Sequence, residues 1–358
     1  MKILGIESSC DETAAAVVQD GECILSNVVA TQIPFHKKYN GVVPEIAGRK
    51  HIEWILPVVK QALSDANLTL SDIDAFAAVN RPGLMGALLV GTTFAKTLAF
   101  TCDKPFLAIN HLEAHLYASS LHTPSEEPKK KPQYPYIGLL VSGGHTIIAL
   151  IKDFNEIEVL GTTIDDAIGE TFDKVSKFYG LGYPGGAVID KLAAKGNPKA
   201  AQFPMPNLKG DHHRYDVSYS GLKTGAINQC NQFWNGEYEQ NTENLAAAFQ
   251  YAACKILVDK LLLACADYSI NTVVVGGGVA ANSALRTMLT SREDINFIFP
   301  PLNLCGDNAA QVAGVAYQRL MNGERSSPDT TALPRITEFR HETNRQLRQK
   351  NSDKTGKN

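Results

Sequence analysis

The sequence lacks several patterns that would assign a protein class directly. Its seven Cys include no C-x-x-C pair, and an odd number without regular spacing fits a reducing compartment better than a disulfide framework. No G-x-x-x-x-G-K-[S/T] stretch occurs, which excludes a P-loop. No apolar run approaches the roughly 20 residues of a membrane-spanning helix, and the first residues show no leader pattern. We expect a cytoplasmic protein without membrane attachment.

Excess charge is also missing. The 358 residues carry a formal net charge of −3, which argues against a nucleic-acid binder held by bulk charge alone. Residues 335–358 nevertheless contain seven Lys or Arg and three Asp or Glu, a balance of +4, so the rest of the chain carries −7. We interpret this segment as a solvated terminus, with an RNA-contacting arm as the alternative.

Two similar stretches are the most informative feature that is present. Lys2 to Val18 and Tyr136 to Ile151 are each an apolar run, a small polar turn ending in Thr, and a second apolar run. This pattern predicts a strand, a hairpin turn and a strand, and its repetition indicates two similar lobes. Backbone N–H groups in the Ser- and Gly-rich turn of the second copy suit a phosphate.

The remaining pattern alternates strands and helices, which favours an α/β fold. Helices are predicted near residues 43–66, 87–100, 166–179, 245–268 and 307–321, and strands near 73–79, 106–109, 272–276 and 295–299. We place the first lobe at residues 1–110 plus about 308–325 and the second at about 111–307, including the polar loop 122–135. Residues 326–358 are expected to form a partly flexible extension.

His111 and His115 are four residues apart, so one helical face presents both imidazoles to a possible metal. Two unrelated histidines remain the alternative. Asp307 is a candidate third ligand, or simply the N-cap of the helix that follows it. A protease zinc helix of the H-E-x-x-H type is a poor match, because Glu113 lies two residues after the first His and points away from the histidine face.

Two further groups are less specific. Asp11 and Glu12 lie in the first hairpin turn, where they are either exposed turn formers or a base or metal partner. The stretch Gly276 to Ala281 fits the G-x-G-x-x-A pattern after a strand, but no acidic residue ends the next strand to hold a ribose. Close strand–helix packing and close approach of a ligand both remain open for these glycines.

Together these pieces resemble one family. A dozen ordered motifs between Met1 and about Pro334 are similar to the TsaD family of tRNA threonylcarbamoyladenosine transferases, formerly described as O-sialoglycoprotein endopeptidases. The motifs are Ile6–Thr13, Gly41–Glu45, Pro82–Leu84, Gly86–Gly91, Asn110–His115, Leu140–Thr146, Asp165–Asp166, Phe172–Lys174, Tyr183–Gly186, Ser218–Thr224, Gly277–Asn282 and Asp307–Asn308.

The resemblance implies a duplicated two-lobe α/β fold of the actin-like, Hsp70-like (ASKHA) class. It also implies transfer of the threonylcarbamoyl group from threonylcarbamoyl-AMP to N6 of the adenosine just 3′ of the anticodon, in tRNAs that read ANN codons, with release of AMP. Asp11 is the candidate proton acceptor, with Glu12 second. One divalent ion, Fe²⁺ or Zn²⁺, is implied on His111, His115 and Asp307. The donor-binding residues are Leu140, Val141, Ser142, Gly143, Gly144, Asp173, Gly186, Asp190 and Asn282.

Bacterial members of the family imply two protein partners, a TsaB-like paralogue and a TsaE-like ATPase. Two departures from the family pattern concern Arg81, where a small residue is usual, and Gly306, where Thr, Ser or Ala is common. Two other functions stay open at this point. One is a metal-dependent glycoprotease, and the other is a non-catalytic nucleotide-binding subunit of a tRNA-modification complex.

Overall fold

A computed structural model describes residues 1–228 and 230–335 of the chain. The described chain divides into two compact units, one formed by Met1–Lys131 with residues 299–335 and the other by Pro132–Ile298. The divisions fall inside the polar loop 122–135 and just before residue 299, not at residues 110 and 308. The second half of the predicted extension, residues 336–358, lies outside the described part.

Packing of two helices explains the shifted boundaries. Helix α4 (His111–Tyr117) lies against α11 (Ala309–Met321), where Arg319 forms an ion pair with Glu113 at 2.5 Å. A Cβ at Gly314 would come within 2.5 Å of the Tyr117 ring, so the two helices touch closely. Both helices therefore belong to the first unit, and sequence spacing alone does not reveal this contact.

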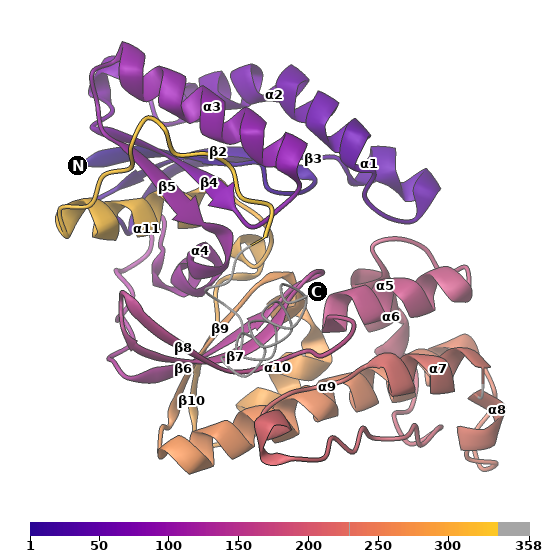
Figure 1. Ribbon diagram of the computed structural model, residues 1–358. Coiled ribbons are helices and arrows are strands. Elements are labelled where there is room, and N and C mark those ends of the chain that lie inside the picture. Colours follow the sequence, from indigo (N-terminus) through magenta and orange to yellow (C-terminus); the bar gives the residue numbers. More distant parts are fainter. Residues whose placement is uncertain (229, 336–358) are drawn as a thin grey trace, which may run out of the picture. The chain divides into compact units, whose positions relative to one another are not determined.

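The first unit is built on a five-stranded mixed sheet (Figure 1). Strands β1 (Lys2–Glu7), β2 (Glu12–Gln19) and β3 (Cys23–Thr31) form an antiparallel meander. Strands β4 (Ala75–Arg81) and β5 (Phe106–Asn110) continue the sheet in parallel beside β1, which gives the order β3-β2-β1-β4-β5.

The second unit repeats this topology. Strands β6 (Tyr136–Val141), β7 (Thr146–Asp153) and β8 (Glu156–Thr162) form the meander, and β9 (Thr272–Gly276) and β10 (Asn296–Ile298) lie parallel beside β6. The order β8-β7-β6-β9-β10 matches that of the first sheet strand for strand. The duplication predicted from the repeated hairpin is thus confirmed, and with it the two-lobe α/β class.

Helices cover both faces of the first sheet. Helices α2 (Pro44–Asp65) and α3 (Met85–Thr101) pack on one face over a core that includes Ile6, Val59 and Phe76. Helices α11 and α4 cover the other face, as Figure 1 shows. Gly5 of β1 permits this close packing, because a Cβ there would lie only 2.5 Å from the Ala309 carbonyl oxygen.

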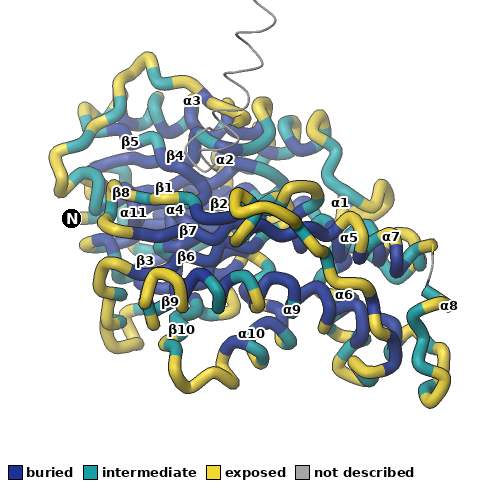
Figure 2. The backbone as a smooth tube through the Cα atoms, turned by 60° about the horizontal axis from the view of Figure 1, so that its bottom comes forward, coloured by how far each residue is buried: buried dark blue, intermediate teal, exposed yellow. Residues whose placement is uncertain are grey.

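In the second unit the long α9 (Thr242–Tyr268) is the central helix. It packs against α6 (Gly185–Ala193), α7 (Ser220–Asn228) and α10 (Ser283–Thr290), and α5 (Ile168–Phe178) packs on α6. The short α1 (Ile33–His36) and α8 (Cys230–Phe233) complete the set of α-helices of the described chain. Figure 2 shows the central strands β1, β4 and β6 and much of α9 as buried residues.

The structure bears on the cysteines and on membrane-spanning helices. All seven cysteines lie within the described residues, and all are free thiols. Among the helices of residues 1–228 and 230–335, none combines the length and apolar character needed to cross a bilayer.

Candidate metal centre and ligand pocket

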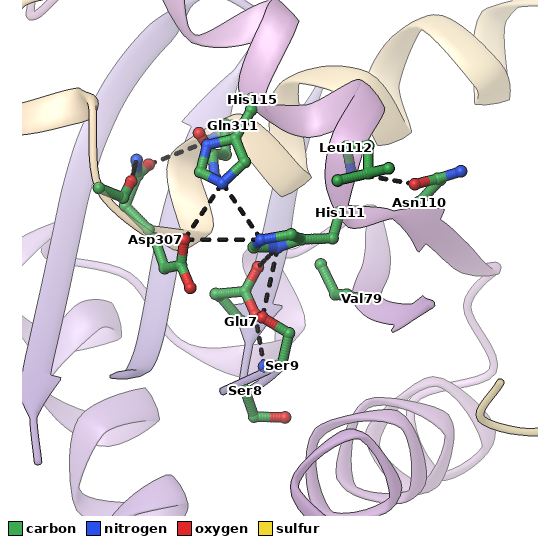
Figure 3. Close-up of polar contacts among 12 residues, drawn as sticks. Glu7, Ser8, Ser9, Val79, Asn110, His111, Leu112, His115, Asp307 and Gln311 are labelled. Atoms are coloured by element: carbon green, nitrogen blue, oxygen red, sulfur yellow. Dashed lines mark hydrogen bonds and ion pairs between the residues drawn. The ribbon is translucent and has the colours of Figure 1, made fainter. Parts of the chain in front are cut away.

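Three predicted metal ligands converge in the first unit. Asn110 ends β5 and caps α4 by accepting from Leu112 N at 2.9 Å, which starts the helix at His111. His115 Nε2 lies 3.1 Å from His111 Nε2 and 3.1 Å from Asp307 Oδ1, and Figure 3 shows the three side chains pointing toward one another. The donor atoms of all three residues lie within 4.8 Å of one another.

Asp307 is not the N-cap of α11. Asn308 has that role, because its side-chain oxygen accepts from Gln311 N at 3.3 Å. The N-cap alternative for Asp307 is therefore wrong, and its carboxylate faces the two histidines. The position follows from the turn before α11, which brings Asp307 against α4 although almost 200 residues separate them in the chain.

Glu7, which the sequence analysis did not single out, orients the first histidine. Its fully buried carboxylate accepts from His111 Nδ1 at 2.9 Å and from Ser9 N at 2.6 Å. With the Nδ1 proton donated to Glu7, the lone pair of His111 Nε2 is directed at His115 and Asp307. A carboxylate behind a ligating histidine is the usual outer support of a metal site. In the sequence, the feature that could have indicated this role is an acidic residue at the end of an apolar strand.

These residues fit a divalent cation. Burial opposes a positive charge on His111, but the carboxylates of Asp307 and Glu7 outweigh it and raise the pKa of the imidazole to about 9. The negative charge of these carboxylates therefore stabilises a positive charge beside them. A bound metal ion can supply that charge, as a proton on the imidazole does. Two imidazole nitrogens and one carboxylate oxygen are ligands that both iron and zinc accept.

The protease alternative finds no support in the position of Glu113. Its carboxylate pairs with Arg319 of α11, which in turn pairs with Glu324 at 2.7 Å. Glu113 thus serves the packing of α4 on α11 and is not directed at the metal ligands. No general base shares the histidine face in the manner of an H-E-x-x-H helix.

Asp11 lies in the turn between β1 and β2, and Glu12 is the first residue of β2. Burial raises the pKa of Asp11, and it raises the pKa of Glu12 to about 10 with a further contribution from the Asp11 charge. Glu12 is also held by Thr31, whose hydroxyl donates to Glu12 Oε1 at 3.1 Å. These acids are therefore not exposed, inert turn formers, which was one of the two alternatives that the sequence left open.

His51 fastens this turn to helix α2. Its Nε2 lies 3.1 Å from the Cys10 carbonyl oxygen, and its Nδ1 lies 2.8 Å from Thr13 Oγ1. A carbonyl oxygen only accepts, so Nε2 must donate. Burial lowers the pKa of His51, so the ring is neutral and Nδ1 accepts from the Thr13 hydroxyl. Both ends of the acidic turn are thus held by one buried ring, which the sequence analysis did not identify.

The predicted ligand pocket lies in the second unit. A cavity of about 440 Å³ is lined by four glycines (Gly143, Gly169, Gly186 and Gly278) and by Asp173, Asp190 and Asn282. Five of the predicted site residues line it: Gly143 in the turn after β6, Asp173 of α5, Gly186 and Asp190 of α6, and Asn282, the N-cap of α10. Asp173 is not simply exposed on its helix, because its Oδ1 accepts from Gly185 N at 2.6 Å.

The turn from Ser142 to His145 has the open backbone that the sequence predicts. Ser142 N donates to the His145 carbonyl at 2.8 Å, which closes the turn. A Cβ at Gly143 or Gly144 would meet no atom within 4 Å, so the side-chain position of each glycine is open space, as a ligand that approaches the turn requires. Leu140 and Val141 are buried strand residues, and Gly143 is the member of the predicted stretch 140–144 that lines the cavity.

Gln250 of α9 connects two residues of the pocket, and the sequence analysis missed it. Its amide donates to Asp190 Oδ1 at 2.9 Å and accepts from Asn282 Nδ2 at 3.2 Å. Asp190 also accepts from Ser283 Oγ at 2.7 Å, and Asn282 caps α10. This buried network fixes both pocket residues. The feature that could have indicated the role of Gln250 is a polar residue among the buried apolar residues of α9.

Comparison with known proteins finds a matching family profile and relatives that carry the same name as that family. Residues 23–314 match the family profile described as TsaD, tRNA N6-adenosine threonylcarbamoyltransferase. A protein of that name from Treponema denticola is 63% identical over 339 residues, which cover 95% of this chain and 98% of the relative. A Brachyspira hyodysenteriae protein of the same name is 50% identical and covers 88% of this chain and 91% of the relative.

Solved structures with low identity share the fold. HypF from T. kodakarensis aligns with a TM-score of 0.59 at 14% identity, over 90% of this chain and 48% of that one. Component A of (R)-2-hydroxyglutaryl-CoA dehydratase from Acidaminococcus fermentans aligns with a TM-score of 0.52 at 13% identity, over 90% and 99%. The actin-like class implied by the family resemblance is confirmed. On the family match and these sequence identities, the chain belongs to the TsaD family, the tRNA N6-adenosine threonylcarbamoyltransferases.

Proposed function

We propose that the two sites divide the work of a tRNA modification. Family membership makes the chain a transferase that forms threonylcarbamoyladenosine in tRNA. The residue assignment that we add places donor binding in the pocket of the second unit and a metal on His111, His115 and Asp307 in the first. The observation that carries it is the convergence of those three ligand atoms, backed by Glu7.

The donor is threonylcarbamoyl-AMP, which offers a phosphate, a ribose and an adenine. The turn at Gly143 and Gly144 suits the phosphate, because no protein atom fills the side-chain position of either glycine and Ser142 N closes the turn on His145. Asp190 keeps carboxylate capacity for ribose hydroxyls, and Asn282 and Gly186 line the wall on which an adenine fits. Leu140 and Val141 contribute as the strand that positions this turn.

The ligand set supports one divalent ion, and iron and zinc both suit it. Such an ion would supply a fixed positive charge that can orient and polarise an oxygen atom bound to it. His111, His115 and Asp307 would hold the ion. Glu7 fixes the orientation of the His111 ring by accepting from its Nδ1.

Proton transfer is assigned to Asp11. The exocyclic amine of the adenosine attacks the carbamoyl carbon, a C–N bond forms, the C–O bond to the phosphate breaks, and AMP leaves with the electron pair. The amine must lose one proton in this exchange. Glu12, with a pKa of about 10, holds its own proton at neutral pH, whereas the raised pKa of Asp11 makes that carboxylate a better base.

The His51 contact gives a test of this assignment. Thr13→Val removes the hydroxyl that donates to His51, so the acidic turn loses one of its two attachments to α2. We expect turnover to fall about 10- to 100-fold with little change in KM for tRNA or donor, since a small misplacement of a catalytic group costs this much. Thr13→Ser keeps the hydroxyl and is expected to retain wild-type turnover. Equal turnover in all three proteins, or equal losses in both variants, would contradict the role of this contact.

Partners and location follow from the substrate. An acceptor tRNA places the reaction in the cytoplasm, and the small net charge of −3 fits tRNA binding shared with a TsaB-like paralogue and a TsaE-like ATPase. The glycoprotease alternative is not favoured by the named relatives or by the Glu113–Arg319 pair.

A reconstituted reaction tests the proposed function. Purified chain and its partner proteins are combined with ATP, threonine, bicarbonate, the enzyme that makes the adenylate, and unmodified tRNA. Nucleoside digestion and mass spectrometry should detect threonylcarbamoyladenosine, and omission of the chain should abolish it. In cells without a second copy, depletion should lower the same nucleoside. Unchanged levels there would refute the transferase assignment.

A further inference from the structure

Gln250 is an amide side chain buried in an apolar helix. The other buried residues of α9 are aliphatic side chains, alanines, one phenylalanine and two cysteines, and only 3% of the surface of Gln250 is exposed. Helix α9 packs here against α6, which carries Asp190, and against α10, which Asn282 caps (Figure 1). A buried amide costs free energy unless both of its ends are hydrogen-bonded. An apolar residue would fill the same volume without that requirement, so packing alone does not account for a glutamine here.

The hydrogen bonds of Gln250 have one possible direction. The Asp190 carboxylate accepts, so Gln250 donates from Nε2 to Asp190 Oδ1 at 2.9 Å and its Oε1 faces Asn282. Asn282 then turns its Nδ2 toward Gln250, at 3.2 Å, and its Oδ1 accepts from Leu285 N at 3.0 Å. That cap demands the same orientation independently, because a backbone N–H only donates. Gln250 therefore fixes the orientation of both neighbouring side chains.

The bonds to Asp190 occupy its two oxygens unequally. Oδ1 accepts from Gln250 Nε2, from Ser283 Oγ at 2.7 Å and from Ser283 N at 3.2 Å. Oδ2 receives one longer contact, from Ser283 N at 3.3 Å. Asp190 lines the cavity of about 440 Å³. The acceptor capacity of Oδ2 suits a ligand that donates a hydrogen bond, and the sugar hydroxyls of a nucleotide are such donors.

We propose that Gln250 is a specificity-determining positioning residue, which holds Asp190 in the orientation that selects a nucleotide with sugar hydroxyls over one without them. The inference rests on the proposed function, in which this pocket takes an adenylate. Gln250 acts through Asp190, since Gln250 itself is not among the described residues that line the cavity. A site built to bond a hydroxyl rejects an analogue that lacks it, because the buried acceptor is then left unpaired.

Two probes separate positioning from general support of the pocket. They are AMP and 2′,3′-dideoxy-AMP, which lacks both sugar hydroxyls, and calorimetry measures the affinity of each for the full chain. We expect the wild type to bind AMP at least about tenfold more tightly than the dideoxy analogue. Gln250→Met keeps the volume but frees Asp190, so AMP affinity should fall about tenfold and that of the analogue about threefold or less. Gln232→Met, the same change at an exposed residue of α8, should keep the wild-type preference.

Gln250→Glu gives a readout that a merely structural role would not move. The introduced carboxyl group can donate to Asp190, as the amide does, only while it carries a proton. As the pH rises and this proton is lost, two carboxylates face each other and the contact breaks. AMP affinity of the variant, divided by that of the wild type at the same pH, should therefore fall at least about tenfold from low to high pH. Asp173 and Lys191 of the cavity and the Cys254 thiol are common to both proteins, so this ratio removes their contribution.

Three results would overturn the positioning role of Gln250. The first is a wild type that binds the two probes equally. The second is an equal loss for both probes in Gln250→Met, which would reduce Gln250 to a support of the pocket's shape. The third is a ratio for Gln250→Glu that does not change with pH, a result that decides the question even if Gln250→Met fails to fold. Failure of the proposed donor pocket is distinguishable, because AMP affinity would then be the same in Gly143→Val as in the wild type.

Discussion

Replacing His111 and His115 together by Ala is expected to remove the bound metal and to lower transferase turnover by about three orders of magnitude. Both imidazoles point at Asp307, and a carboxylate alone in that position lacks the ligands to retain a divalent ion. Loss of several kcal/mol of charge stabilisation corresponds to a rate change of this size. Elemental analysis of the purified variant measures the metal, and single-turnover transfer to tRNA measures the rate.

A graded series separates ligation from general damage. Glu7→Gln keeps the size of the side chain but loses the charge behind His111, and we expect metal affinity to fall about 10- to 100-fold. His212→Ala changes an exposed histidine of the second unit and should keep full metal content. Full occupancy in the double His variant would refute the ligand assignment, and loss of metal in His212→Ala would show that the effect is not local.

Gly143→Val is expected to raise KM for the donor by at least about 100-fold while the fold stays intact. A Cβ at Gly143 meets no protein atom within 4 Å, so the new side chain fits without strain and occupies space inside the pocket. A phosphate that must approach the backbone N–H groups would meet the valine methyl groups instead. Equilibrium binding of a non-hydrolysable donor analogue measures the loss directly.

A second glycine provides the control for this substitution. Gly236 lies in an exposed turn of the same unit, and a Cβ there also meets no atom within 4 Å. Gly236→Val should leave donor affinity and melting temperature near wild-type values. If Gly143→Val bound the analogue as tightly as this control, the phosphate could not lie on the Ser142–Gly144 backbone.

The two copies of the hairpin illustrate how far sequence patterns carry. Both hairpins were predicted from two apolar runs separated by a small polar turn, and the two sheets have the same strand order. The turn that contains Gly143 and Gly144 stayed open, as its composition indicates. The turn of Asp11 and Glu12 is packed and fastened by His51, which composition does not indicate, because the partner comes from a helix some 40 residues away.

Boundaries of the two units were a weaker prediction. The sequence analysis placed His111 and His115 in the second lobe with the predicted donor-binding residues. They lie instead in the first unit, whereas the pocket that we propose for the donor lies in the second. Local patterns locate helices within a residue or two, as α2 and α3 show. They do not say on which sheet a helix packs, since that depends on contacts such as the ion pair of Glu113 with Arg319.

Sequence alone determined the features with a short-range cause: the strand and helix periods, the duplicated hairpin, the pair of histidines on one helical face and the open glycine turn. Tertiary structure decided those with a long-range cause. It brought Asp307 to the histidines, placed Glu7 behind His111, joined Asp190 to Asn282 through Gln250, and buried Asp11 and Glu12 so that their pKa values rise. The physical reason is the same in each case, because the charge state and orientation of a side chain depend on neighbours that the chain supplies from distant residues.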